Sequence, residues 1–361
     1  MRTGVRGRAD APRSGTPRWP GRVGLHDPYG QGRQTMARDP KELEQLRMMT
    51  KVSHLYHTRG IVQTEIAKTL GISQARVSRL LAAAEEANIV RTIVVPPPGL
   101  NADLEEGVER MFGMREVHVV DASGETGEQC TETLGVALAG VFQVLPVGDK
   151  MIGFTSWSRS MRRFVENLTS FPHSSARAVV ELLGGVGQPT IQHQATNATE
   201  RLASLTDAEA LFLRVPGVVS TPDVREAILA NDPHARRALA AMDELDIALV
   251  GIGNATIVPP LVGGENFFTQ EQFDDVRARG AVGEINLNFM DADGRPVASP
   301  LDDLVIGVGL DQLRRAERRI GVSGGADKHE ALLAAVRGGW INVLVTDEES
   351  AQYLLAQGPA R

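Results

Sequence analysis

The sequence predicts an α/β protein in two parts: an N-terminal winged helix-turn-helix, then a larger domain on a doubly wound, mostly parallel sheet. Three observations predict it. A helix-turn-helix pattern occupies residues 61–84, short apolar runs alternate with helical patterns after about residue 101, and the prolines of residues 96–98 separate the two parts. With 361 residues and 42% apolar content, the chain can build two or three domains with buried cores.

Composition excludes several classes of protein. The single cysteine, Cys130, rules out an internal disulfide and a thiolate zinc cluster. Aromatic residues make up 4% of the chain, which argues against a base-stacking platform for single-stranded nucleic acid. Because no apolar run reaches the roughly 18 to 20 residues that cross a bilayer, and no secretory signal is visible, we expect a cytoplasmic protein.

The formal net charge of −7 is unevenly distributed. Residues 1–40 carry eight Arg and three Asp, and residues 41–95 carry eight cations and five Glu, so these segments are +5 and +3 and the remainder is −15. A basic front end on an acidic body presents the front end to a polyanion. Nucleic acid is therefore the first partner that we expect.

Residues 1–40 are rich in Arg, Gly and Pro and have no helical or strand period, which predicts a disordered basic tail. Met36 stands just ahead of the first amphipathic segment, so an unused upstream start explains this tail as well as a functional one does.

The helix-turn-helix pattern reads IVQTEIAKTLGISQARVSRLLAAA. It predicts a helix over Thr64–Leu70, a left-handed turn at Gly71 and a second helix from Gln74, with Thr64 and Ser73 as N-caps. With Val77, Leu80, Leu81 and Ala84 facing inward, short and cationic side chains point outward, and these suit a DNA major groove. The candidate DNA-binding residues are Thr64, Ser73, Gln74, Ala75, Arg76, Ser78 and Arg79. The alternative to a DNA-binding unit is a helical hairpin whose arginine face is simply solvated. Residues 89–95, after the second helix, are a candidate wing.

The larger part reads as alternating strands and helices, which indicates a parallel sheet covered on both faces. The expected strands are Val117–Val120, Met151–Phe154, Ala178–Leu183, Ile247–Ile252, Leu304–Gly307, Ile320–Ser323 and Ile341–Val345. The expected helices are Gly127–Phe142, Ser158–Leu168, Asp223–Leu229, Pro233–Leu245, Ala326–Arg337 and Asp347–Leu355.

Several of these strands end in small residues, at Gly184-Gly185, Gly251-Ile252-Gly253 and Ser323-Gly324-Gly325 among others. Ligands of open α/β sheets bind outside the carboxyl ends of the strands, so we expect the pocket at this edge. No glycine-rich run matches a nucleotide signature, and no two histidines have ligand spacing, so we expect neither a nucleotide cofactor nor a metal.

Two cations indicate the charge of the ligand. Arg159 and Lys328 stand near helix starts, where a cation opposes the helix dipole unless an anion is nearby. With the hydroxyls of Thr155, Ser156 and Ser158 they suggest a phosphate or a carboxylate. Alternatively, the side chain of either cation could simply extend into water and bind no ligand. Asp291, in a stretch DADGRP, could accept hydrogen bonds from sugar hydroxyls, or it could form a plain Asx turn.

The chain resembles the SorC family of bacterial sugar-responsive transcriptional regulators, which is related to DeoR-type regulators. The resemblance covers about residues 43–355. The segments that carry it are TEIAKTLGISQARVSRLL, GFTSWSRSM, DIALVGIGN, GAVGEINLNFMDADGRPV and VSGGADKHEALLAAVRGGWINVLVTDEESAQYLL.

The resemblance implies a sugar-binding domain like ribose-5-phosphate isomerase and glucosamine-6-phosphate deaminase, a phosphorylated sugar or polyol effector, and a tetramer on operator DNA. Trp157-Ser158 departs from the glycine-rich phosphate loop of many relatives. The effector residues that it implies are Thr155, Ser156, Trp157, Ser158, Arg159, Gly184, Gly185, Gly251, Gly253, Asp291 and Lys328. The domains that we expect are a tail over 1–40, a winged helix-turn-helix over 41–95, a Pro-rich linker over 96–100 and an effector-binding and oligomerisation domain over 101–361.

Two further hypotheses remain at this stage. The chain could be a sugar-phosphate isomerase or deaminase in which Lys328 or Glu284 works with Asp291 in acid–base chemistry, although only the fold supports this. Alternatively, the helix-turn-helix could serve protein contacts alone. Its binding would then not depend on salt, whereas DNA binding weakens steeply as salt rises. We expect a transcription factor, not an enzyme, whose operator affinity a sugar-derived effector changes.

Overall fold

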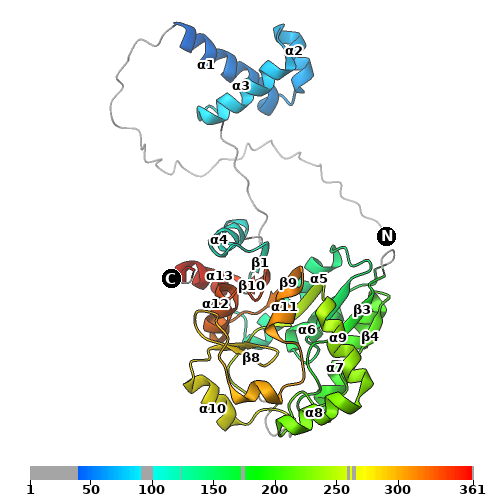
Figure 1. Cartoon of the computed structure of the whole chain (residues 1–361). Coiled ribbons are helices and arrows are strands. Elements are labelled where there is room, and N and C mark those ends of the chain that lie inside the picture. Colours follow the sequence, from blue (N-terminus) through cyan, green and yellow to red (C-terminus); the bar gives the residue numbers. More distant parts are fainter. Residues whose placement is uncertain are drawn as a thin grey trace, which may run out of the picture. The chain divides into compact units, whose positions relative to one another are not determined.

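The computed structural model describes residues 40–90, 101–122, 124–171, 175–257, 261 and 266–359, and these residues fall into two compact units. The first unit is 40–90 and the second is 101–359; each is described by itself below (Figure 1). Residues 1–39 of the expected tail, residues 91–95 of the candidate wing and the Pro-rich linker lie outside the described residues, and Pro40, expected in the tail, is the first residue of a helix.

The first unit consists of three helices. Helix α1 (Pro40–Ser53) continues as a π-helical turn, η1 (His54–Thr58), and is followed by α2 (Gln63–Leu70) and α3 (Gln74–Glu86). Gly71 joins α2 to α3 with a φ of 64°, and the side chain of Ser73 accepts a hydrogen bond from Arg76 N at 3.2 Å, as expected of a turn and an N-cap. A small apolar core of Met49, Val52, Ile66, Ala67, Val77, Leu80, Leu81 and Ala84 unites the helices.

One expected cap in this unit is wrong. Helix α2 begins at Gln63, and Val62 is its N-cap, without a side-chain hydrogen bond. The reason is that the carbonyl oxygen of Val62 already accepts the first helical hydrogen bonds, from Glu65 N and Ile66 N. Thr64 therefore lies inside the first turn of α2 and caps nothing.

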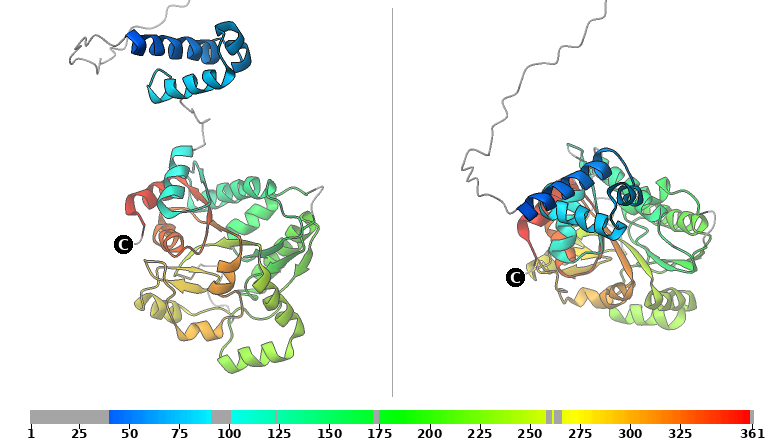
Figure 2. Two further views of the ribbon diagram at one scale, coloured as in Figure 1. Left: turned by 45° about the horizontal axis from the view of Figure 1, so that its top comes forward. Right: turned by 90° about the horizontal axis from the view of Figure 1, so that it is seen from above.

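The second unit is built on a sheet of seven parallel strands in the order β1-β10-β9-β5-β2-β3-β4. Figures 1 and 2 show this sheet between helices. The strands are β1 (Glu116–Val120), β2 (Met151–Phe154), β3 (Ala178–Glu181), β4 (Glu209–Leu211), β5 (Ile247–Gly251), β9 (Arg318–Val322) and β10 (Val343–Asp347).

Alternating residues of the strands face opposite sides of the sheet and contribute to two separate apolar cores, as expected of a sheet covered by helices on both faces. On β2 and β5, Ile152, Phe154, Ile247 and Leu249 belong to one core, while Ala248 and Val250 belong to the other. The first core lies under α5 (Gly127–Gln143), α6 (Arg159–Asn167) and α7 (Pro189–Leu205). The second lies under α4 (Ala102–Phe112), α9 (Pro233–Ala241), α11 (Leu310–Arg315), α12 (His329–Arg337) and α13 (Glu348–Gln357).

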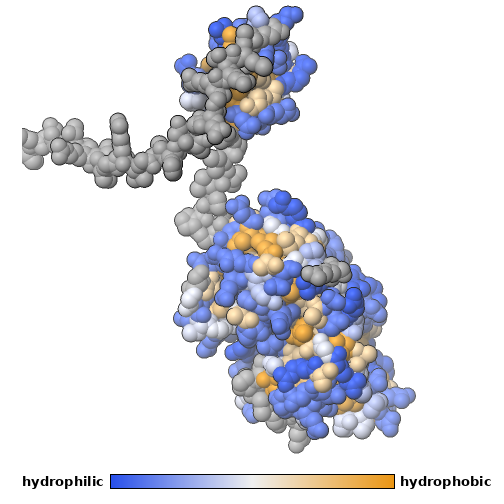
Figure 3. Space-filling model, turned by 90° about the vertical axis from the view of Figure 1, so that its left-hand side faces the viewer, coloured by the Kyte–Doolittle hydropathy of each residue, from blue (hydrophilic) through white to orange (hydrophobic). Residues whose placement is uncertain are grey.

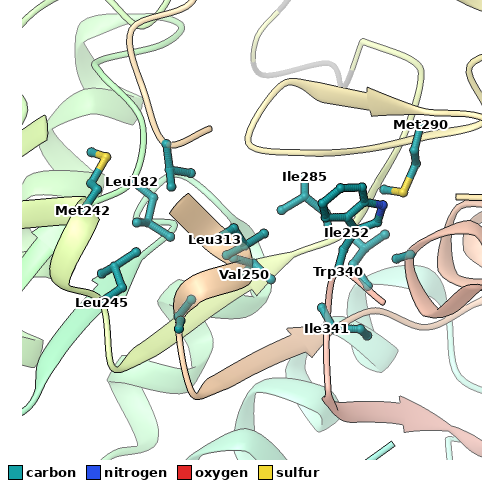
Figure 4. Close-up of a cluster of buried hydrophobic side chains, with 14 of the residues drawn as sticks. Leu182, Met242, Leu245, Val250, Ile252, Ile285, Met290, Leu313, Trp340 and Ile341 are labelled. Carbon is teal, nitrogen blue, oxygen red and sulfur yellow. The ribbon is translucent and has the colours of Figure 1, made fainter. Parts of the chain in front are cut away.

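A second, antiparallel sheet stands beside the main one and consists of β6 (Gly253–Asn254), β7 (Gly283–Ile285) and β8 (Asn288–Met290). Figure 4 shows how its apolar side chains meet the main sheet: Ile285 and Met290 lie close to Ile252 and Trp340 in one buried cluster. The remaining elements are α8 (Pro222–Asn231), α10 (Gln270–Ala278) and the short 3-10 helices η2 (Met242–Glu244), η4 (Pro300–Leu304) and η5 (Ala326–Lys328).

Six of the seven expected strands are present within two residues of their expected ends, and the expectation for Leu304–Gly307 is wrong. Pro300 begins the 3-10 helix η4 there, and Ser299 and Asp302 form a capping box at its start. The residues that follow make only isolated antiparallel bridges, Val305 to Val218 and Gly307 to Leu183, and do not join the sheet.

The chain reverses its direction across the sheet between β2 and β5. From β2 it proceeds outward through β3 to β4, and from β5 it proceeds the other way through β9 to β10. Adjacent strands at such a switch point send their following loops apart, which leaves a crevice at their carboxyl ends. The fold thus places the favoured position for a ligand between the ends of β2 and β5.

Candidate functional site

A pocket occupies this switch point, at the carboxyl ends of β2, β5 and β9. It has about 1040 Å³ of space free of protein atoms, its open mouth included, and we call it the crest pocket. Thr155 N, just after β2, donates to the carbonyl oxygen of Leu249 in β5 at 3.1 Å, so the backbone fixes the two strand ends against each other. Seven of the expected effector residues line the crest pocket: Thr155, Trp157, Ser158, Arg159, Gly251, Gly253 and Lys328.

The start of α6 forms one wall of the crest pocket. Ser158 is the N-cap of this helix, and its side chain makes no capping hydrogen bond. No acidic residue stands in the first turn, whereas Arg159 is its first residue and is exposed. A Cβ atom on Gly251 would stand 2.9 Å from Ser158 Oγ, so the glycine lets the helix start approach β5. This wall offers a helix dipole, a hydroxyl and a cation to an anionic group.

Another wall of the crest pocket carries a half-buried cation, Lys328, and a buried acid, Glu284. Lys328 Nζ donates to Asn254 Oδ1 at 3.0 Å, and burial lowers the pKa of Lys328, while nearby Asp327 and Glu284 act in the opposite direction. Burial raises the pKa of Glu284 to about 7, against the opposing effects of the Leu287 N–H and of Lys328. The wall can therefore accept hydrogen bonds from hydroxyl groups through Glu284 and donate to an anion through Lys328.

The turn between β7 and β8 brings Glu284 into this wall. Asn286 and Leu287 have φ values of 49° and 63°, the left-handed pair that a tight two-residue hairpin needs, and neither is a glycine. Leu287 N donates to Glu284 Oε2 at 2.7 Å, and Thr155 Oγ1 bonds to Asn286 Oδ1 at 3.0 Å. Non-glycine residues held in this region of φ concentrate at functional sites, because the surroundings must offset their strain.

Two residues of β10 hold the loop that carries Lys328. Thr346 Oγ1 donates to the carbonyl oxygen of Ser323 at 2.7 Å, and Gly325 N donates to Asp347 Oδ2 at 2.7 Å. Asp347 is 4% exposed and also caps α13 by accepting from Ser350 N at 2.9 Å. One buried carboxylate therefore fixes both a wall of the crest pocket and the start of the last helix.

The other expected effector residues lie elsewhere. Ser156, Gly184 and Gly185 line a neighbouring hollow at the end of β3, together with Glu181. Burial raises the pKa of Glu181, whose oxygens accept from Thr199 Oγ1 and from Leu213 N at 3.0 Å each. Trp157 lines both this hollow and the crest pocket, so it stands between them.

Asp291 does not line the crest pocket. Its Oδ1 accepts from Asp293 N at 3.0 Å and from Arg295 N at 2.9 Å, and Gly294 adopts a φ of 78°. This is the Asx turn that was the alternative explanation of the sequence. The acid–base arrangement of an enzyme that combined Lys328 or Glu284 with Asp291 is therefore not assembled in one pocket.

Two polar residues of the crest pocket, Asn254 and Glu284, were not among the expected effector residues. Asn254 follows the Gly251-Ile252-Gly253 motif directly, so its position in the sequence was a usable signal. Glu284 was considered only as an acid or base of an enzyme, and it reaches the pocket through the pairing of β6 with β7. Among the residues that the structure describes, no group of three or more His, Cys, Asp or Glu could hold a metal ion.

The candidate DNA-binding residues lie on the outer face of α3, at its N-cap and at the start of α2, and all of them are exposed. Arg79 Nε makes one local hydrogen bond, to the carbonyl oxygen of Ala75 at 3.2 Å, which leaves the guanidinium tip unused within the described chain. In the view of Figure 3 the surface of the first unit is mainly hydrophilic. The exposed candidates are Thr64, Ser73, Gln74, Ala75, Arg76, Ser78 and Arg79.

Comparison with known proteins covers most of the chain. A family model described as "Putative sugar-binding domain" matches residues 97–356. The sorbitol operon regulator of Klebsiella pneumoniae is 32% identical over 318 residues, which cover 86% of this chain and 98% of that protein. The deoxyribonucleoside regulator of Bacillus subtilis is 28% identical over 313 residues, with coverage of 86% and 98%.

Solved structures agree with these relatives. The crystal structure of the full-length sorbitol operon regulator SorC from Klebsiella pneumoniae aligns with a TM-score of 0.63 and 30% identity, covering 86% of this chain and 99% of that one. The probable sor operon regulator from Shigella flexneri aligns with a TM-score of 0.62 and 29% identity, covering 71% and 99%. No helix among the described residues is long and apolar enough to span a membrane. The chain belongs to the SorC family of sugar-binding transcriptional regulators, and it is a regulator and not an enzyme.

Proposed function

We propose that the chain controls a carbohydrate or polyol operon by binding operator DNA through residues 41–95 and a phosphorylated sugar through residues 101–361. The first segment acts as a winged helix-turn-helix, and residues 96–100 act as the linker. We further propose that the protein works in the cytoplasm as a homodimer or homotetramer, as sugar-responsive regulators with repeated operator sites do.

The DNA-binding part of the proposal rests on the outer face of α3. The exposed side chains of its first six residues are short, polar or cationic, and Arg76 and Arg79 can reach phosphates or the edge of a guanine. Ser73 and Gln74 stand at the start of α3, where a recognition helix contacts base edges, and Thr64 at the start of α2 is within reach of the DNA backbone in such a docking.

The single observation that carries the effector proposal is that Lys328 and Glu284 line the same pocket as the start of α6. A phosphate group fits between the cations and the free helix start, because Arg159 and Lys328 both supply donors there. Glu284 and Asn254 then accept or donate hydrogen bonds to sugar hydroxyls. Ser158, Thr155 and the two glycines of β5 and β6 complete the contact surface.

Titration of a labelled duplex carrying the protein's own promoter tests this proposal. Fluorescence anisotropy with the full chain should show operator binding that one member of a panel of sugars, polyols and their phosphates changes by about 5- to 150-fold. The Lys328→Met variant should bind the same duplex but lose the effector response, because the half-buried ammonium group is gone.

Lys150→Met is the matched control. Lys150 precedes β2, at the opposite end of that strand from the crest pocket, and pairs with Asp246 at 3.0 Å. This variant should keep the response to the effector. The proposal fails if no phosphorylated sugar or polyol alters operator binding, or if Lys328→Met responds like the wild type.

A further inference from the structure

A second, basic groove adjoins the crest pocket between α5, α6 and α7. It has about 1120 Å³ of space free of protein atoms, its open side included, and we call it the arginine groove. Thr131, Arg159 and Arg162 line both the arginine groove and the crest pocket. The two spaces are therefore neighbours that share one wall, the first turns of α6.

Four arginines line the arginine groove, against two carboxylates, Glu128 and Glu166. Arg163 is already neutralised, because it pairs with Glu132 and Glu166 at 2.8 Å each. No ion pair engages Arg159, Arg162 or Arg201 within the described part of the chain; Arg201 Nε donates to the carbonyl oxygen of Val165 at 3.0 Å. The groove thus keeps three guanidinium groups that lack a carboxylate partner.

Arg162 is the most constrained of the three. It is partly buried, and its Nη1 donates to the carbonyl oxygen of Trp157 at 2.7 Å. Burial lowers the pKa of Arg162, nearby Glu166 raises it, and Arg159 and Arg163 lower it. Arg159 and Arg162, which have no ion-pair partner within the described part of the chain, stand in the first turns of α6, where cations oppose the positive end of the helix dipole. A partly desolvated Arg162 beside the like charge of Arg159 is unfavourable until an anion balances the two.

We propose that the arginine groove binds a second anionic group of the effector, so that the effector is a sugar carrying two phosphate groups. This inference rests on the proposed function: one phosphate lies in the crest pocket between Lys328 and the start of α6, and the other lies beyond Arg159 in the groove. Guanidinium groups bind phosphate oxygens in pairs of parallel hydrogen bonds. Gln194 and Asn197 of α7 add uncharged donors on the far wall.

Isothermal titration calorimetry of the full chain distinguishes one phosphate from two. We would titrate pairs of mono- and bisphosphorylated fructose, glucose and ribulose, with 6-phosphogluconate as a sugar carrying one phosphate and one carboxylate. At least one bisphosphate should bind ten times more tightly than its own monophosphate. The affinity of 6-phosphogluconate is compared with that of monophosphorylated glucose. If its carboxylate raises the affinity as much as the second phosphate of the bisphosphate does, the second group needs only to be an anion, and the assignment to a second phosphate is overturned.

Gln194→Glu places a negative charge in the groove without lengthening the side chain, and Gln194 does not line the crest pocket. It should weaken bisphosphate binding about tenfold and leave monophosphate binding within twofold of the wild type. Gln357→Glu is the control for net charge, because Gln357 is exposed at the end of α13. It should change neither affinity.

The two proposals fail in different ways. If a monophosphate binds and Lys328→Met abolishes that binding, but no bisphosphate binds more tightly, the crest pocket stands and the arginine groove is not a phosphate site. An equal loss of both affinities in Gln194→Glu also overturns the inference. If no sugar phosphate binds the wild type at all, the proposed function fails and this inference fails with it.

Discussion

Gly253 of β6 lies directly against the carboxyl group of Glu284 in β7. The two residues are register partners in the antiparallel sheet, and a Cβ atom on Gly253 would overlap Glu284 Oε1. The glycine lets the acid fold back over the neighbouring strand, where its other oxygen accepts from Leu287 N. The missing side chain at position 253 therefore fixes the position of the acid in the crest pocket.

Gly253→Ala should both destabilise the second unit and weaken the effector response. The methyl group displaces a fully buried carboxyl group that has little room to move, and overpacking of this kind costs about 1–3 kcal/mol. The free energy of unfolding from urea denaturation measures the first effect, and operator binding with and without the effector measures the second.

Gly140→Ala is the matched control. Gly140 lies inside α5 on an exposed face, and a Cβ atom there would have no neighbour within 4 Å. The change should stabilise the protein by about 0.5–1 kcal/mol, because alanine is the better helix former. A Gly253→Ala variant as stable as the wild type would mean that the Glu284 carboxyl group moves freely, contrary to the contacts described above.

Glu284 should make the stability of the second unit depend on pH. Its pKa is about 7 in the folded chain and 4.5 in a model peptide, so the unfolded chain releases the proton at lower pH. Below about pH 4.5 the raised pKa does not lower the free energy of unfolding. As pH rises through 7, it lowers the free energy of unfolding by up to about 3 kcal/mol. Stability attributable to this group therefore falls between pH 4.5 and pH 7.

Glu284→Gln should remove this dependence, because the amide has the shape of the acid and does not titrate. Urea denaturation of both proteins at intervals from pH 5 to pH 8 gives the comparison. The difference in unfolding free energy between variant and wild type should move in favour of the variant as pH rises. A difference that stays constant across this range would show that Glu284 does not titrate there.

The central strands could be predicted because they are buried on both faces and appear as continuous apolar runs. The strand β4 has only three residues at the edge of the sheet, and β6, β7 and β8 have two or three each, which is too short for a pattern of period two. Helix α7 was missed for a different reason. Its buried residues are mostly small, Ala195, Ala198, Thr199, Leu202 and Ala203, so its apolar stripe is weak.

Some residues of the candidate site could be predicted from the sequence and others could not. Residues at the end of a strand or directly after it, such as Gly251 and Thr155, could be assigned to the sheet edge, because all parallel strands end there. Glu284 could not be placed, because it reaches the pocket only through pairing between β6 and β7. Neither could the arginine groove, since α5, α6 and α7 approach one another only in the folded unit.

Asp347→Asn should loosen the loop that carries Lys328. Asp347 Oδ2 accepts from Gly325 N and, at 2.9 Å, from Ser350 Oγ, and an amide group in its place would face these donors with a donor of its own. Leaving such buried groups unpaired costs about 1–3 kcal/mol. Denaturation should show this loss, and the effector affinity should fall with it.

Asp232→Asn provides the matched comparison. Asp232 is also an N-cap, of α9, and its Oδ1 alone accepts from His234 N and Ala235 N at 2.9 Å. Asparagine caps helices as well as aspartate does, so this variant should lose less than about 0.5 kcal/mol. Equal losses in both variants would show that Asp347 acts as an ordinary helix cap with no special effect on the loop.

Arg79→Ala should weaken operator binding by about 1–3 kcal/mol if its guanidinium group reads a base, and the loss should be larger on the native site than on unrelated DNA. The fold does not depend on this side chain, because the hydrogen bond that it makes is local, to the carbonyl oxygen of Ala75. Arg47→Ala is the control: Arg47 is exposed on α1 and approaches Glu44 at 3.8 Å. Anisotropy titrations at several salt concentrations measure both variants.

If Arg79→Ala weakens native and unrelated duplexes equally and lowers the salt dependence by about one charge, Arg79 contacts a phosphate, and base recognition belongs to its neighbours on α3.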